Sequence, residues 1–170
     1  MSSYKESLAL SEQIEEQAGA AICAFNLGRA YQDLPALRDL AAAEQWYRRD
    51  LELTDESDHL GRAQTINQLG LVAYERFLEA RAAGAAEAEQ LKHLNAALNY
   101  YQQALTLLPA NAVNDLAVTH NQLGLIYKNA GQTPRALEHY QQSINFKEQA
   151  GNIYSAGTTR FNVALMLAQQ

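Results

Sequence analysis

Histidine, cysteine and carboxylate side chains are the residues of this sequence that could hold a metal ion or carry out catalysis. His59, His93, His120 and His139 share no metal-ligand spacing with one another or with Cys23. No glycine-rich phosphate loop and no Ser-His-Asp order is present. The sequence therefore predicts no catalytic residue, no metal site and no cofactor. The four histidines are expected at the surface or at helix ends.

An acidic run and the single cysteine also have plain structural explanations. The run Asp55-Glu56-Ser57-Asp58 lacks the glycine and the distal glutamate of a calcium loop, so we interpret it as a solvated linker that caps a helix. Cys23 lies in the apolar stretch of residues 20–25, where a reduced and buried thiol is expected.

Asparagine and glutamine offer a different chemistry, because one amide can donate to and accept from a peptide backbone at once. An amide precedes the leucine or valine in each of four similar segments, which defines an amide row of Asn26, Gln68, Gln122 and Asn162. Helices pack about 10 Å apart and an extended strand rises about 3.3 Å per residue, so one amide would meet every third peptide residue. The alternative is that these amides hydrogen-bond between adjacent helices and keep them in register.

Four copies of one helix are the elements that must position this row. They cover residues 25–31, 67–73, 121–127 and 161–167, and their leucine or valine recurs after 42, 54 and 40 residues. Each of the first three copies is followed by a second helix that carries an alanine and a tyrosine four residues apart, hence on one face. These are Ala43 and Tyr47, Ala97 and Tyr101, and Ala136 and Tyr140.

Composition agrees with an all-α protein and limits its partners. Only 3 prolines and 9 glycines occur, and 48% of the residues are hydrophobic. The net charge of −6 and the scattered Lys and Arg argue against nucleic acid. No membrane span or signal peptide is indicated, so we expect a cytoplasmic protein.

The third copy and the helix after it resemble the tetratricopeptide repeat (TPR). The matching residues are Leu123, Gly124, Tyr127, Gly131, Ala136, Tyr140 and Ser143. The segments Asn67-Gln68-Leu69 and Asn121-Gln122-Leu123 are similar to the Asn-Asn-Leu pattern of the longer repeats in kinesin light chains, the Pins/LGN spindle-orientation adaptors and bacterial signalling TPR arrays. The resemblance implies a right-handed α-solenoid of antiparallel helix pairs, the TPR superhelix.

The resemblance also implies a concave groove lined by the first helix of each pair. Helical spacing then groups side chains into the columns Phe25/Arg29/Gln32, Asn67/Leu71/Tyr74, Asn121/Leu125/Lys128 and Phe161/Leu165/Ala168. The candidate residues for binding a protein or peptide are Asn26, Arg29, Asn67, Gln68, Leu71, Tyr74, Asn121, Gln122, Leu125, Lys128, Phe161 and Asn162.

We expect a single TPR domain over residues 1–170. It divides into a second-type half-repeat (1–18), repeats 1 to 3 (19–54, 57–108 and 112–149) and a first-type half-repeat (153–170). The second repeat is 15 residues longer than the third, which predicts two helices extended past a turn near Gly84, by about two turns or 11 Å each. This elongated hairpin is interpreted as a solvated tip; the alternative is a ridge that walls the groove or touches a neighbouring domain.

The function expected from these features is a non-enzymatic scaffold that binds a peptide or protein segment in the groove, as part of a larger multidomain protein such as a bacterial signalling protein. The alternative is a self-associating structural module, a homo-oligomer formed through the terminal helices. The apolar helix of residues 153–170 favours this alternative, because a repeat buries its apolar side only against neighbours.

Overall fold

The computed structural model describes Glu6 and residues 16–168, and this part of the chain is all-α, as predicted. Its helices are α2 (Gln17–Asp33), α3 (Leu40–Leu53), α4 (His59–Ala82), α5 (Glu87–Leu107), α6 (Val113–Asn129), α7 (Thr133–Gln149) and α8 (Ile153–Ala168). The second-type helix predicted for residues 1–18 falls largely outside the described residues. Within them, no helix is both long and apolar enough to cross a bilayer.

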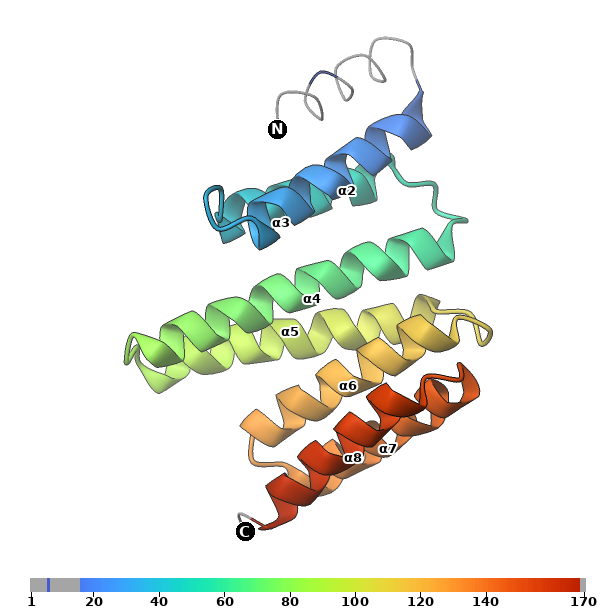
Figure 1. Cartoon of the computed structure of the whole chain (residues 1–170). Helices are drawn as coiled ribbons and strands as arrows, with labels where there is room; N and C mark the ends of the chain where they lie inside the picture. Colours follow the sequence, from blue (N-terminus) through green and yellow to red (C-terminus); the bar gives the residue numbers. More distant parts are fainter. Residues whose placement is uncertain (1–5, 7–15, 169–170) are drawn as a thin grey trace.

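The helices pack as the antiparallel pairs α2–α3, α4–α5 and α6–α7, which follow one another in a row, and α8 packs against α7 at the far end (Figure 1). Neighbouring pairs meet through α3 with α4 and α5 with α6. The first helices α4 and α6 also touch each other directly.

A glycine of the first helix meets a tyrosine ring of the second helix at the same place in every pair. A Cβ added to these glycines would lie 2.7 to 2.9 Å from the nearest ring carbon, closer than any ordinary contact. The contacts are Gly28 with Tyr47, Gly70 with Tyr101, and Gly124 with Tyr140. The absent side chain is therefore what lets the two backbones approach.

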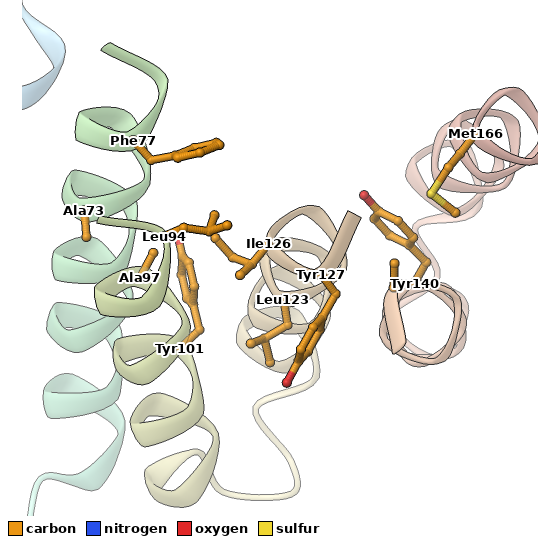
Figure 2. Packing of buried hydrophobic residues seen from close by; sticks show 11 residues of the cluster. Ala73, Phe77, Leu94, Ala97, Tyr101, Leu123, Ile126, Tyr127, Tyr140 and Met166 are labelled. Atoms are coloured by element: carbon orange, nitrogen blue, oxygen red, sulfur yellow. The ribbon is translucent and has the colours of Figure 1, made fainter. Parts of the chain in front are cut away.

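The largest core cluster spans the second and third pairs and ends on α8. Figure 2 shows these buried residues from α4 to α8: Ala73, Phe77, Leu94, Ala97, Tyr101, Leu123, Ile126, Tyr127, Ala136, Tyr140 and Met166. A second cluster joins α3 to α4 through Leu40, Tyr47, Leu69 and Val72. Apolar burial thus continues from pair to pair.

The α4–α5 pair is longer than its neighbours. α4 has 24 residues and α5 has 21, against 14 to 17 for the other described helices. The turn falls at Gly84, whose φ of 67° is accessible to glycine without strain. Residues 81–84 and 86–89 are exposed, whereas the base of the extension is held on both sides: Glu79 pairs with Arg38, and Arg81 donates to Asn129 of α6 at 2.7 Å.

Candidate functional site

The amide row lies on the first helices, and three of its members are half-buried. Asn26 of α2, Gln68 of α4 and Gln122 of α6 are partly covered, while Asn162 of α8 is exposed. None of the four side chains hydrogen-bonds to another residue of the described part. The interhelical register bonds that would explain the row structurally are thus not made by these amides in that part of the chain. Each half-buried amide keeps a donor and an acceptor available at the surface.

The bonds that join the first helices come from other side chains, at the edge of the row. Asn67 Nδ2 of α4 donates to Thr119 Oγ1 of α6 at 2.8 Å, and Thr119 is fully buried. Towards the start of α4, a second hydrogen bond joins the two helices, from Gln64 to Asp115 at 3.0 Å. Towards the end of α4, Asn129 of α6 donates to the Tyr74 hydroxyl at 3.1 Å and accepts from Arg81.

Several predicted site residues take part in these α4–α6 contacts or are buried, so they do not face the groove. Asn67 and Tyr74 are engaged between α4 and α6, and the Tyr74 ring also packs on the main core cluster. Gln32, placed in a groove column by its spacing, is only 1% exposed. It accepts from the Tyr47 hydroxyl at 2.8 Å and donates to Glu75 at 3.2 Å, so its assignment to the groove column is wrong.

The remaining predicted residues are distributed over the same helices. Leu71 and Leu125 are half-buried beside the row, and Leu125 packs against the main core. Arg29 is exposed and pairs with Asp33 at 3.4 Å, which is a weak contact. Lys128 is exposed at the end of α6, and Asn121 is half-buried without a side-chain hydrogen bond to another described residue. Phe161 stands 64% exposed on α8.

A cleft of about 500 Å³ opens where α2, the end of α3 and the start of α4 meet. Its apolar wall consists of Ala18, Ala21, Ile22, Phe25 and Leu53. Its polar side consists of Gln17, Asn26, Asp50, Thr54, Asp55, Asp58, Gln64 and Thr65. The residue pattern does not predict this cleft, although it places Asn26 beside the groove and Phe25 in it, because the cleft volume depends on how three helices cross.

Asp50 is the most deeply placed carboxylate of the cleft, with 5% of its surface exposed. It accepts from the hydroxyls of Thr65 and, at 3.2 Å, Thr54. Burial raises its pKa, and the two threonine hydrogen bonds oppose that rise. Arg62 lies close by, but its guanidinium donates to the backbone carbonyls of Leu51 and Thr54, at 3.0 Å each.

The acidic linker caps α4, as expected from the sequence. Asp58 accepts from the backbone N–H of Gly61 at 2.8 Å, and Asp55 accepts from the backbone N–H of Ser57 at 2.8 Å. The Ser57 bonds lower the pKa of Asp55. Over Glu6 and residues 16–168, no group of three or more His, Cys, Asp or Glu side chains is placed to hold a metal ion.

The interpretation of His120 and His139 as surface or helix-end residues is wrong. They lie in the middle of α6 and α7, half-buried, with their Nδ1 atoms 3.0 Å apart, so one imidazole donates and the other accepts. Tyr127 stacks on His139 and Phe146 stacks on His120. Burial lowers the pKa of both imidazoles, that of His120 to about 4 with a further contribution from His139.

Two smaller expectations concern His59 and Cys23. His59 is exposed at the first position of α4, in agreement with its interpretation. Cys23 is a free thiol, as expected, but it is half-buried rather than buried, and it packs against the small cluster of Ala20 and Leu27.

No protein-family profile matches this chain, and no curated protein is similar enough to count as a relative. The tetratricopeptide resemblance therefore depends on the motif residues and on the geometry described above.

Proposed function

We propose that this chain is a protein-interaction scaffold: a right-handed α-solenoid of tetratricopeptide-type pairs that binds an extended peptide or protein segment along α2, α4 and α6. The observation that carries the proposal is the amide row. Three half-buried amides on successive first helices have no side-chain partner in the described part of the chain. Their oxygen and nitrogen atoms are not among the buried atoms without a partner, so they can exchange solvent for the backbone of a bound segment.

The repeated glycine–tyrosine contact supports the tetratricopeptide assignment. All three pairs use it at the same place, and the α6–α7 turn is closed by Gly131 in the left-handed region at φ 69°. Such an array supplies a surface shape, and the side chains on that surface decide what it binds. A cytoplasmic location and membership of a larger multidomain protein remain predictions.

Selection of peptides from a random display library on the intact chain tests this proposal. The binding constants of selected peptides are then measured on wild type and on Gln68→Ala/Gln122→Ala. Each lost backbone hydrogen bond is worth about 1 kcal/mol, so we expect at least a tenfold loss of affinity.

The matched control is Gln103→Ala/Gln142→Ala, which removes two exposed amides from the second helices α5 and α7. It should leave the affinity unchanged. Equal affinities for the amide-row variant and wild type would refute binding along this row, and so would a comparable loss in the control.

Self-association through α8 is the second candidate function, because α8 carries an exposed apolar surface. Phe161 is 64% exposed, Leu165 46% and Leu167 48%. We expect sedimentation velocity to show a mass that rises with concentration, and Phe161→Asp/Leu165→Asp to return the chain to a monomer. A monomer at every concentration would remove this candidate.

A further inference from the structure

The cleft between α2 and α4 combines features that suit one kind of side chain. Its volume of about 500 Å³ lies within the range of small-ligand sites, about 300–1,000 Å³. One wall is apolar, with Ile22, Phe25 and Leu53, and Ile22 is 63% exposed. The opposite side carries three carboxylates, and no Lys, Arg or His is among the lining residues of the described chain.

The deepest carboxylate forms no ion pair with a described residue: the Arg62 guanidinium lies in its field but donates to backbone carbonyls. Asp50 is only 5% exposed, and its hydrogen bonds come from two threonine hydroxyls rather than from a charged group. A buried carboxylate is costly even where neutral donors and one nearby guanidinium compensate it, and a further cation brought into its field reduces that cost. Asp55 and Asp58 add negative charge at the linker side of the same cleft.

The cleft is also continuous with the proposed binding face. Asn26 belongs both to the amide row and to the cleft lining. A segment held by the row on α4 and α6 therefore reaches the cleft when it arrives at α2. A side chain that projects from that end of the segment enters the cleft between the apolar wall and the carboxylates.

We propose that this cleft receives the cationic side chain of a lysine or arginine from the bound segment, with its aliphatic stem against Ile22, Phe25 and Leu53. Long cationic side chains bury their methylene stems along apolar surface and keep the charged group at polar positions. The inference rests on the proposed function for the segment, but the cleft can be tested apart from it.

N-acetyl-arginine amide is the probe for the cleft alone, added to the full chain and followed by backbone amide chemical shifts. We expect saturable shifts at Ile22, Gly61 and Thr65, and no saturable shifts with N-acetyl-norleucine amide, which has the stem without the charge. No shift at these residues would overturn the proposal, whatever the peptide library returns.

The variant for this test is Asp55→Asn/Asp58→Asn. Asparagine keeps the oxygen that accepts from Ser57 and from Gly61, and it caps helices as well as aspartate does, so two charges are removed with the local structure kept. Asp50 is left unchanged because it is buried and hydrogen-bonded. The control is Asp39→Asn, which changes the exposed N-cap of α3, outside the cleft lining.

Peptides selected on wild type supply the second arm. We expect a lysine or arginine at one fixed position, and a loss of affinity of at least tenfold when that residue is replaced by norleucine or when the chain carries the double asparagine change. Peptides that depend on the amide row but show no basic preference would overturn the cleft proposal and leave the scaffold intact. If N-acetyl-arginine amide binds the cleft but the library yields no binding peptide, the bound segment is not the source of the cation, and a small free cation is indicated instead.

Discussion

Replacing Gly124 with alanine should overpack the contact between α6 and α7. The new Cβ would lie 2.7 Å from Cδ1 and Cε1 of the Tyr140 ring and 3.0 Å from its Cγ, whereas ordinary contacts begin near 3.4 Å. Tyr140 is 5% exposed and packed in the main core cluster, so ring and helix must separate by several tenths of an ångström. Overpacking of this kind costs about 1–3 kcal/mol.

The helix propensity of alanine partly hides this cost, because a glycine-to-alanine change inside a helix gains up to about 1 kcal/mol. Gly157 of α8 supplies the control, since a Cβ added there meets no atom within 4 Å. Gly157→Ala should therefore show the propensity gain alone. The difference between the two variants isolates the overpacking term, which we expect at about 1–3 kcal/mol.

Urea unfolding followed by far-ultraviolet circular dichroism measures this difference, provided that the three proteins share one m-value. A third variant, Gly124→Ala/Tyr140→Ala, removes the ring and should remove the penalty of the added methyl group relative to Tyr140→Ala. If Gly124→Ala and Gly157→Ala agree within about 0.5 kcal/mol, the usual scatter of harmless substitutions, the close-approach reasoning is refuted.

Two further predictions concern the buried imidazoles and phenols. Burial lowers the pKa of His120 from 6.5 to about 4 and also lowers that of His139. As the pH falls, the unfolded chain therefore binds protons before the folded chain does, and stability that is present above pH 6.5 is lost towards about pH 4. The free energy of unfolding should fall by about 2–3 kcal/mol over this pH range. The urea midpoint of His120→Gln/His139→Gln should vary less with pH than that of wild type, and parallel curves for the two proteins would contradict this. Tyr47→Phe should cost about 1–3 kcal/mol by leaving the buried Gln32 oxygen without its donor. Tyr101→Phe should cost under about 0.5 kcal/mol in the same urea unfolding measurement, because the Tyr101 hydroxyl has no partner in the described part of the chain. Equal costs for the two variants would show that the Tyr47–Gln32 hydrogen bond is not responsible.

The helices and the close glycine contacts could be predicted from the sequence because both are local consequences of it. A small residue and a tyrosine four apart define one face, and Gly124 lies where that face must meet its partner helix. The turn at Gly84 was likewise predictable, because a helix-forming stretch interrupted by a glycine indicates a hairpin rather than a loop.

The histidine pair could not be predicted in the same way. His120 and His139 are 19 residues apart on different helices, so no spacing rule within one helix brings them together. Their contact depends on the rotation of α6 relative to α7 about the Gly124–Tyr140 contact. The cleft depends similarly on the path of the linker and on the small side chain of Ala21, while Gly61 lets the Asp58 carboxylate lie directly against α4.

The adjacent amides Asn67 and Gln68 show why the candidate site could be predicted only in part. Consecutive residues of a helix point about 100° apart, so one faces α6 while the other faces the open side of the row. Both are amides and both precede Leu69, hence their types cannot separate an interhelical bond from a binding contact. The separation comes from Thr119, a residue 52 positions away, whose hydroxyl engages Asn67 and not Gln68. A change at Asn67 therefore tests the stability of the array, and only changes at Gln68 and Gln122 test the binding face.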